Sequence, residues 1–481
     1  MNILKRSAHA VAALGFMAFG AVSIASAQTA PIPNPNNPAA FPPFGQCSTN
    51  TIPDLPKSWS SNALLTPFES QPLQVARVMS GDMPGERYML TVTDNVPSTT
   101  TVAWLTVTSK ASPNIGRSFK IINGADGNLQ CSPAQLPPNV QWRAPNTDYL
   151  AKANCTCMGS NEVIGIKADA WRCPNGQKLN ATTDAYDWFW YSQGNNPRPV
   201  RYLFSRPNNK QSLPVLGNAA MTHFTSFDGQ AQNKMGDYIT ACLGNGPVQT
   251  KLPQPAVQGV SFESKKIPQP PVWTDKAFSN GALFAIDGTY TSMAIYYDWT
   301  IRQEVTKILS SAADLKLYPN NPKLADTRLT KGRTYQVSYD PKGNRVFPKN
   351  AQESQMGGIL GNVGIWRPDW AKYDNCQYKA TIAAASPLNP TRSQPLKALS
   401  CFFAQHIGGA ESNIQAWYTY SDEPVMFYET NAGDLDLIDY VSWMPNATIP
   451  PGVLYDIPAH VQKLPPAMMT DCNACHGKIH N

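Results

Sequence analysis

The clearest fold signal in the chain is the stretch TTTVAWLTVTS at residues 99–109, which is rich in β-branched and aromatic residues. Such side chains fit the pleated surface of a strand better than the surface of a helix. The preceding stretch ERYMLTVTD, at residues 86–94, has Tyr88, Leu90 and Val92 at alternate positions. A period of two puts these three side chains on one face of a strand. Both stretches therefore predict β-strands.

Similar signals continue toward the C-terminus. TSMAIYYDW at residues 291–299 predicts another strand. RTYQVSYDPKGNRVF at residues 333–347 alternates strand-forming residues and then contains Asp-Pro-Lys-Gly, so it predicts a hairpin. Helical patterns are scarce, and the best candidate, IRQEVTKILSSAADL at residues 301–315, is equally compatible with a strand. We therefore expect a mostly β fold with antiparallel sheets and long loops.

A proline-rich stretch at residues 244–270 divides the chain into two parts. It predicts a linker between a first β-domain at residues 51–243 and a second at residues 271–458, each long enough to bury a core. A proline-rich leader at residues 28–50 precedes the first domain, and a short tail at residues 459–481 follows the second.

The two predicted domains share the order of a cysteine, an aromatic cluster and a Pro-Val pair. These elements are Cys173, WFWYS at 188–192 and PVRYLF at 199–204 in the first domain, and Cys401, WYTYS at 417–421 and PVMFY at 424–428 in the second. The agreement in order and spacing favours a duplication over coincidence in an aromatic-rich chain. A superposition of the domains is then expected to place Trp188 on Trp417 and Pro199 on Pro424.

The N-terminus has the features of a secretory signal. Lys5 and Arg6 precede an apolar run that ends in a small-residue Ala-Ser-Ala site at residue 27. This pattern favours a cleaved signal peptide at residues 1–27 over a membrane anchor. No later stretch of the sequence is long and apolar enough to span a bilayer. We expect a periplasmic or secreted protein with no membrane span after the signal is cleaved.

The charge of the mature chain is mild. Cleavage of the signal removes two cations and lowers the formal net charge from +6 to +4. The sequence contains no dense run of basic residues. These features argue against nucleic acid as a partner.

The ten cysteines are an even number, and the predicted compartment is one in which thiols pair. Disulfides are therefore favoured over a metal site at the CTC sequence that Cys155 and Cys157 form. These two residues are too close in sequence to pair comfortably with each other, so each is expected to reach elsewhere. Cys173 is the natural partner for one of them.

A second bridge, between Cys376 and Cys401, is the easiest to propose in the second domain, because no other cysteine lies there. Cys47 is expected to tie the leader to the fold. The remaining disulfide connectivity stays open at this point.

The repeated aromatic and Pro-Val elements, together with MAIYYDWTIRQ at residues 293–303, resemble strands of ependymin-like carriers. The resemblance covers scattered strands only. It implies a secreted β-protein whose curved, half-open sheet encloses an apolar small-molecule ligand. The many aromatics and few charges suit such a pocket, and they serve equally well as sheet cores.

Hydrolytic motifs are absent, since the sequence has neither a G-x-S-x-G elbow nor an H-E-x-x-H helix. A catalytic triad built on His223 or His406 stays open, although lone histidines in β-proteins more often lie on the surface or fill a core. Asp434 and Asp436 are interpreted as part of a solvated strand face.

The C-terminal tail contains CNACHG, in which Cys472, Cys475 and His476 have the spacing C-x-x-C-H. This short stretch resembles the haem-attachment motif of c-type cytochromes. The resemblance implies that the two thiols bind the haem vinyl groups covalently and that His476 is an axial ligand of the iron. The implied cofactor is haem c, and the implied function is electron transfer with a redox partner protein.

The tail departs from that family because only five residues follow His476, so no helical domain can wrap the haem there. A second axial ligand has to come from another part of the chain or from another molecule. Met468 or Met469 is the prediction, because a thioether suits an electron-transfer haem, and His460 is the other upstream candidate.

Other interpretations of the motif are a Cys472–Cys475 disulfide, a zinc site that includes His476 and His480, and a haem-free remnant. At the level of function, the rival to electron transfer is a disulfide-stabilised carrier of an apolar ligand without haem. A third hypothesis is an enzyme that uses the haem on a small substrate.

Overall fold

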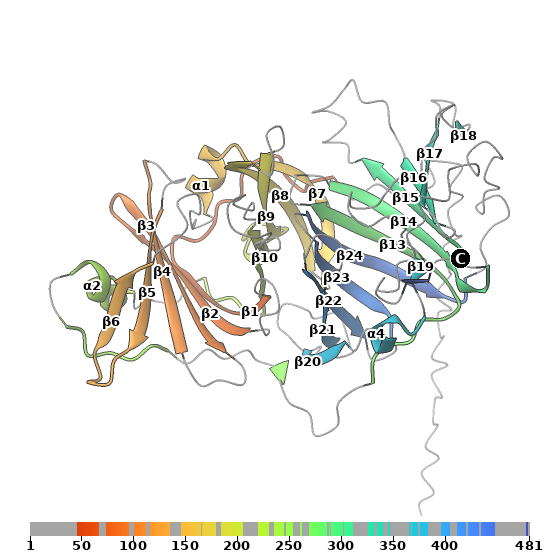
Figure 1. Ribbon diagram of the computed structural model, residues 1–481. Helices are drawn as coiled ribbons and strands as arrows, with labels where there is room; N and C mark the ends of the chain where they lie inside the picture. Colours follow the sequence, from red (N-terminus) through yellow and green to blue (C-terminus); the bar gives the residue numbers. More distant parts are fainter. Residues whose placement is uncertain are drawn as a thin grey trace, which may run out of the picture. The chain divides into compact units, whose positions relative to one another are not determined.

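The structure is a computed structural model, drawn in Figure 1. It describes residues 46–66, 74–95, 101–111, 116–134, 146–164, 166–178, 184–204, 220–229, 235–244, 247–253, 260–261, 269–285, 288, 290–301, 303–310, 326–330, 334–339, 345–346, 365–366, 368–373, 376–382, 396–404, 411–419, 422–431, 434–447 and 478–479.

The first sheet has eleven strands in the spatial order β6-β5-β4-β3-β2-β1-β11-β10-β9-β8-β7. They are β1 (Trp59–Thr66), β2 (Gln74–Met83), β3 (Glu86–Asn95), β4 (Thr101–Ser109), β5 (Gly116–Asn123), β6 (Leu129–Pro133), β7 (Thr156–Val163), β8 (Ile166–Lys178), β9 (Asp184–Ser192), β10 (Pro199–Phe204) and β11 (Ala220–Phe224). All its neighbouring strands are antiparallel. The strand β1 is central, because it pairs with β2 on one side and with β11 on the other.

The second sheet has twelve strands in the order β12-β20-β21-β22-β23-β24-β13-β14-β15-β16-β17-β18. They are β12 (Val260–Ser261), β13 (Lys276–Ala285), β14 (Tyr290–Asp298), β15 (Gln303–Ser310), β16 (Asp326–Thr330), β17 (Thr334–Tyr339), β18 (Arg345–Val346), β20 (Gln377–Ile382), β21 (Leu396–Ala404), β22 (Glu411–Thr419), β23 (Pro424–Asn431) and β24 (Asp434–Pro445). This sheet is also antiparallel throughout. Figure 1 shows its strands in green to blue.

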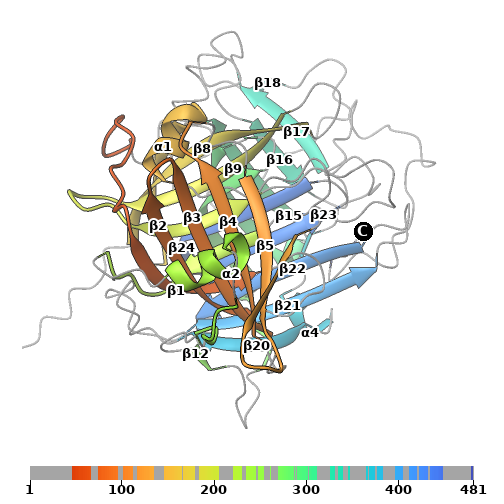
Figure 2. The same ribbon diagram turned by 90° about the vertical axis from the view of Figure 1, so that its left-hand side faces the viewer.

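The predicted mostly β fold is confirmed, and the strand signals explain why. Tyr88, Leu90 and Val92 are all buried on β3, on the face that packs against the helix α2 (Gly236–Leu243). Figure 2 shows α2 lying across the strands of this part of the first sheet. The predicted hairpin is present as well, since β17 pairs with β18.

The stretch at residues 301–315, which is compatible with either a helix or a strand by sequence, contains the strand β15. β15 pairs with both β14 and β16. Its β-branched residues Val305, Thr306 and Ile308 favour the strand, and two neighbouring strands satisfy its backbone groups. Among the described residues, no helix is long and apolar enough to cross a membrane.

Each sheet carries an aromatic cluster beside a short helix, and we call these the first and second outer clusters. The first packs beside α1 (Thr147–Lys152) and the second beside α4 (Trp370–Tyr373). The first includes Trp59, Tyr149, Cys173, Phe189, Tyr191, Tyr202 and Phe224, and the second includes Trp273, Tyr297, Trp370, Cys376, Leu399, Tyr418 and Phe427.

A third cluster, which we call the inter-sheet core, joins residues of the two sheets. Leu64, Trp188, Trp190 and Leu203 of the first sheet belong to the same buried cluster as Phe284, Met426 and Leu437 of the second. The Trp188 ring lies 5.3 Å from the Phe284 ring, and its indole nitrogen donates to the Ala285 carbonyl at 2.9 Å. The two sheets therefore share one core along these faces.

Three disulfides lie within the part of the chain that contains the first sheet. They are Cys47–Cys157, Cys131–Cys242 and Cys155–Cys173. The third confirms Cys173 as the partner of one CTC cysteine. Such bonds persist where thiols are oxidised, so the disulfides indicate an oxidising compartment.

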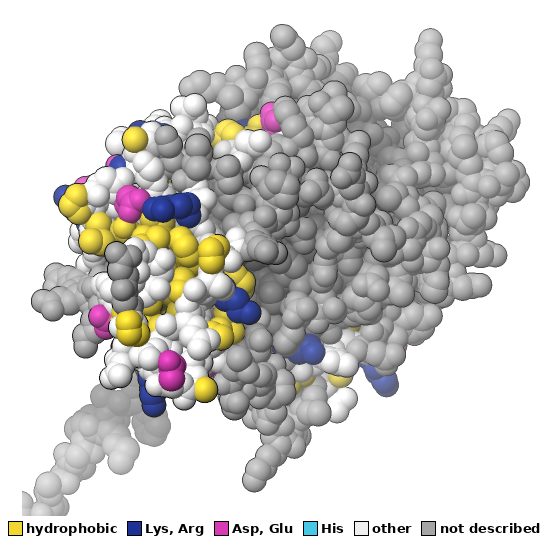
Figure 3. Space-filling model, turned by 60° about the vertical axis from the view of Figure 1, so that its left-hand side comes forward, with side chains coloured by type: hydrophobic (Ala, Val, Ile, Leu, Met, Phe, Trp, Pro, Cys, Tyr) yellow, Lys and Arg dark blue, Asp and Glu magenta, His cyan; other side chains and the backbone are white. Residues whose placement is uncertain are grey.

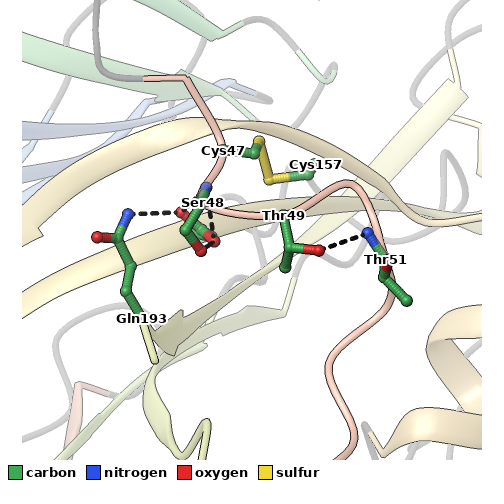
Figure 4. Close-up of a disulfide and its surroundings, with 7 residues drawn as sticks. Cys47, Ser48, Thr49, Thr51, Cys157 and Gln193 are labelled. Atoms are coloured by element: carbon green, nitrogen blue, oxygen red, sulfur yellow. Dashed lines mark hydrogen bonds between the residues drawn. A yellow bond between two sulfur atoms is a disulfide. The ribbon is translucent and has the colours of Figure 1, made fainter. Parts of the chain in front are cut away.

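The first of these disulfides fixes the end of the proline-rich leader, as Figure 4 shows. Next to Cys47, the Ser48 amide donates to the buried carboxylate of Asp169, at 3.1 Å to Oδ1. Gln193 donates to the same oxygen from its side-chain amide at 2.9 Å. A covalent bond and a shared carboxylate thus hold the last residues of the leader, from Cys47, against β7, β8 and the end of β9.

If β12 is left aside, the two sheets have the same strand order. In each, the first remaining strand pairs with the last, five further strands follow on one side of that pair, and four precede the last strand on the other. β1–β6 then correspond to β13–β18, and β7–β11 correspond to β20–β24. β12, from the predicted linker, is an addition at the outer edge beside β20.

Strand pairing also relates single residues of the two sheets. Pro199 lies opposite Tyr191, and Pro424 lies opposite Tyr418, so these prolines hold corresponding positions. In the same alignment Trp190, which lies opposite Arg201, corresponds to Trp417, which lies opposite Met426. Trp417 thus aligns with Trp190 rather than with Trp188. The duplication itself, and the domain boundaries, stay predictions that a superposition would test.

The described residues of the predicted linker divide between the sheets. The Leu252 side chain packs in the core beneath α2, and its amide donates to the Asn123 side chain at 3.0 Å. Val260 and Ser261, in contrast, pair with β20 of the second sheet. The change of sheet therefore takes place between residues 253 and 260.

Candidate functional site

The predicted haem residues Cys472, Cys475, His476, Met468 and Met469 lie outside the described residues, as do His460 and His406. The described part of the tail is β25 (Lys478–Ile479), which starts two residues after His476. It pairs with β19 (Ile365–Trp366) in a small antiparallel sheet. The backbone beyond the motif is therefore joined to the segment that leads into α4.

The cysteines outside the tail are largely accounted for. Six are joined in the three disulfides of the first part of the chain, and Cys376 is also disulfide-bonded. The register of β20 and β21 pairs Gln377 with Ser400, so its continuation sets Cys376 opposite Cys401. In the first sheet, Thr156 pairs with Arg172 in the same way, directly beside the Cys155–Cys173 disulfide.

The described residues contain a different constellation at the centre of the inter-sheet core. We call it the inter-sheet polar cluster. Its members are Asn161 on β7, Trp190 on β9, Arg201 on β10, His223 on β11 and Asp439 on β24. Arg201 is 0% exposed, and Asp439 and His223 are 3% exposed each. Charged groups buried to this extent require partners, because removal from water is costly.

The centre of the cluster is an ion pair between the two sheets. The Arg201 guanidinium donates from Nη1 to Asp439 Oδ2 at 2.6 Å and from Nη2 to Oδ1 at 2.8 Å. This two-pronged geometry matches the planar guanidinium to the carboxylate. Arg201 Nη2 also lies 3.8 Å from the sulfur of Met426.

Asn161 and Trp190 of the first sheet also contact this ion pair. The Asn161 side-chain amide donates to Asp439 Oδ2 at 3.0 Å, and the Trp190 indole donates to Asn161 Oδ1 at 3.0 Å. The Arg201 guanidinium lies over the Trp190 ring, 5.1 Å from its centroid, where a cation is attracted to the π face. Trp190 thus supports the ion pair both directly and through Asn161.

His223 accepts a hydrogen bond from the third nitrogen of the guanidinium. Arg201 Nε donates to His223 Nε2 at 3.1 Å, so the imidazole is neutral and carries its proton on Nδ1. Burial, and secondarily the Arg201 charge, hold the pKa of His223 well below its usual value. His223 is therefore a filled core position bound to Arg201, and the cluster contains no hydroxyl or thiol nucleophile for it to activate.

Chemically, the cluster joins the two sheets through an ion pair and its hydrogen bonds. Arg201 directs its Nε, Nη1 and Nη2 to His223 and Asp439, and the Asp439 carboxylate accepts from two different residues. Among the described residues, no group of three or more His, Cys, Asp or Glu side chains is placed to hold a metal ion.

The sequence does contain a sign of this cluster, namely single charged residues within apolar strands, but motifs and repeats do not reveal it. Arg201 is the one charged residue within PVRYLF, and Asp439 stands within the apolar stretch LIDYV. A charge inside an apolar strand predicts a buried partner elsewhere in the chain. In this strand, the residues predicted from sequence to form part of a solvated face are Asp434 and Asp436. Their side chains lie outside the described residues.

The surface of the first part of the chain is mixed in character. On the face shown in Figure 3, hydrophobic side chains gather between scattered basic and acidic ones, and none of the coloured side chains is a histidine. Met83, Ile122 and Leu243 are among the exposed large hydrophobic residues.

Comparisons with known proteins do not assign a family. No protein-family model matches the chain, and no curated protein matches it. Among solved structures, an uncharacterized conserved protein from Thermus thermophilus has 11% identity and a TM-score of 0.22, covering 38% of this chain and 84% of its own. Kievitone hydratase from Nectria haematococca has 10% identity and a TM-score of 0.13, covering 83% of this chain and 98% of its own. Structural similarities this weak do not indicate a function for this protein.

Proposed function

We propose that the protein is exported to the periplasm or secreted, carries a haem c attached at its C-terminus, and acts in electron transfer. Cys472 and Cys475 would hold the haem covalently, and His476 would be its axial ligand. Met468 or Met469 is the proposed second ligand. The haem would supply a one-electron redox centre, and the two-sheet body would supply its anchorage and face a redox partner protein.

The observation that supports this proposal most strongly is the use of the other cysteines. Six cysteines form the three disulfides of the first part of the chain. Cys376 is also disulfide-bonded, and the register of β20 and β21 favours Cys401 as its partner. That assignment leaves Cys472 and Cys475 outside the disulfides of the sheets. Two such cysteines next to a histidine, in an oxidising compartment, fit covalent haem attachment better than a role in holding the sheets together.

The pairing of β25 with β19 gives a second line of support. A haem held at His476 would need protein beside it. Because Lys478 and Ile479 pair with Trp366 and Ile365, the tail has a fixed neighbour on the segment before α4. A haem at His476 would therefore lie close to that segment rather than on a free end.

The test is an absorption spectrum of the full chain produced in a host that matures c-type cytochromes. We expect a haem band in the wild type, its loss in Cys472→Ser/Cys475→Ser, and an altered band in His476→Ala. The melting temperature of the double variant is expected to stay close to that of the wild type, because so short a tail contributes little core.

A matched control removes a disulfide from the first sheet. Cys155→Ser/Cys173→Ser is expected to lower the melting temperature and to keep the haem band. A colourless wild type would contradict the proposal and favour the alternative of an apolar-ligand carrier. A large fall in the melting temperature of Cys472→Ser/Cys475→Ser would show that this pair is a structural disulfide.

A further inference from the structure

We propose that His223 makes the contact between the two sheets sensitive to acid, so that protons favour a state in which the inter-sheet core opens. The proposal rests on where His223 lies. It is buried between the sheets, and its Nε2 accepts from the arginine that forms the inter-sheet ion pair. Protonation of Nε2 would remove that acceptor and place two cations side by side.

The inter-sheet polar cluster contains one cationic and one anionic residue besides His223. Arg201 on β10 is cationic, and Asp439 on β24 already accepts two hydrogen bonds from Arg201 and one from Asn161. Leu64, which pairs with His223 on β1, is uncharged. The residues that surround Arg201, namely Trp190, Asn161 and Met426, are uncharged as well. Asp439 is thus the sole anionic group of the inter-sheet polar cluster.

The direction of the effect follows from linkage. In the closed state His223 stays neutral, because burial and Arg201 lower its pKa. In an open, hydrated state its pKa returns to about 6.5. The open state therefore binds a proton that the closed state does not, and the closed state loses stability as the pH falls below about 6.5. One proton per opening predicts a rise of about 25-fold in the open fraction between pH 7 and pH 5.

Methionine oxidation by dilute hydrogen peroxide reports this opening site by site. Met426 and Met221 are both 0% exposed and belong to the inter-sheet core. Met89 and Met235 are buried in clusters of the first sheet that do not belong to that core. Peptide mass spectrometry of the full chain gives each oxidation rate, which is divided by the rate of free methionine at the same pH.

We expect the normalised rates at Met426 and Met221 to rise about 25-fold from pH 7 to pH 5 in the wild type. Met89 and Met235 are expected to change by less than about twofold, because no titrating histidine is described beside them. His223→Gln keeps a neutral acceptor near Arg201 and is expected to abolish the rise at Met426. His223→Asn serves the same purpose if the glutamine variant does not fold.

Three results would overturn the proposal. A flat rate at Met426 in the wild type would show that the interface does not open on acidification. An equal rise at Met89 would show global unfolding instead of separation of the sheets. A rise that persists in a folded His223 variant would assign the proton to another group. Each result is independent of whether haem is attached, because the wild type and its variants share the same tail.

Discussion

Each sheet has an outer cluster built from the same parts, whereas the inner faces differ at two corresponding positions. Outside, α1 precedes the bonded Cys155, as α4 precedes the bonded Cys376. Inside, strand pairing aligns Arg201 with Met426, and it aligns His223, opposite Arg201, with Asp439, opposite Met426. The first sheet thus contributes a cation and a base where the second contributes a thioether and an acid.

This difference separates two ways of stabilising the molecule. Each outer cluster combines apolar burial with a bonded cysteine, and in the first sheet the disulfide lies within that sheet. The inner faces add one buried ion pair to an apolar core, and the pair links one sheet to the other. A buried pair adds little net stability compared with apolar residues of the same shape, but it strongly disfavours any arrangement that separates its members.

The largest effect is expected from Arg201→Met, which gives the first sheet the residue that the second sheet has at this position. The substitution leaves the Asp439 carboxylate buried without its cation, which costs about 3–5 kcal/mol of unfolding free energy. Urea denaturation followed by tryptophan fluorescence measures the loss. The double variant Arg201→Met/Asp439→Leu is expected to recover most of it, because an apolar pair can replace a buried ion pair.

A loss below about 1 kcal/mol in Arg201→Met would show that Asp439 finds another partner or is hydrated. The ion pair would then not be what joins the two sheets.

The second largest effect is expected when the disulfide of an outer cluster is removed, and it tests whether the two outer clusters correspond. Removal of the Cys155–Cys173 disulfide, which closes a sequence separation of 18 residues, is expected to cost about 3 kcal/mol. Cys376→Ser/Cys401→Ser is expected to cost a similar amount in the second sheet, and Cys401→Ser alone is expected to release one reactive thiol at Cys376. Non-reducing peptide mapping locates that thiol. A wild-type crosslink from Cys376 to Cys472 or Cys475 would refute the correspondence.

The smallest effect is expected from Trp190→Phe. The change removes the hydrogen bond to Asn161 and weakens the π face beneath Arg201, which together cost about 1–2 kcal/mol beyond the lost packing. In the Arg201→Met/Asp439→Leu background no cation lies over the ring. The cost of Trp190→Phe beyond the lost packing is then expected to be that of the hydrogen bond to Asn161 alone. Equal losses in both backgrounds would show that Trp190 and the ion pair are not coupled.

The sheets were predictable from sequence because their signals are local. Alternation at Tyr88, Leu90 and Val92 and the β-branched run that follows specify strands without knowledge of their neighbours. Cys173 could be assigned to the CTC pair for a similar reason, because the residues are near one another along the chain. Residues 301–315 stayed ambiguous, because pairing on both sides decides that strand and sequence does not show pairing.

The inter-sheet polar cluster was not predictable in the same way. Arg201 and Asp439 are separated by 238 residues, so their contact depends on the packing of one sheet on the other. The position of Trp190 shows the same limit, because counting residues from Cys173 selected Trp188, whereas strand register selects Trp190 as the counterpart of Trp417. Cys173 lies opposite Asp187, whereas Cys401 lies opposite Ile414, so the first connection is one residue longer. The first pairing has a register irregularity between Pro174 and Lys178, and such an irregularity has no clear signature in a single sequence.

The mass of the intact, unreduced mature protein tests the proposed function most directly. If Cys472 and Cys475 hold a haem, the mass is that of the chain from about residue 28, increased by one haem and reduced by the hydrogens of four disulfides. The same haem increment is then expected on the C-terminal peptide alone. A mass without that increment, reduced by the hydrogens of five disulfides, from a host that matures c-type cytochromes, would contradict the account.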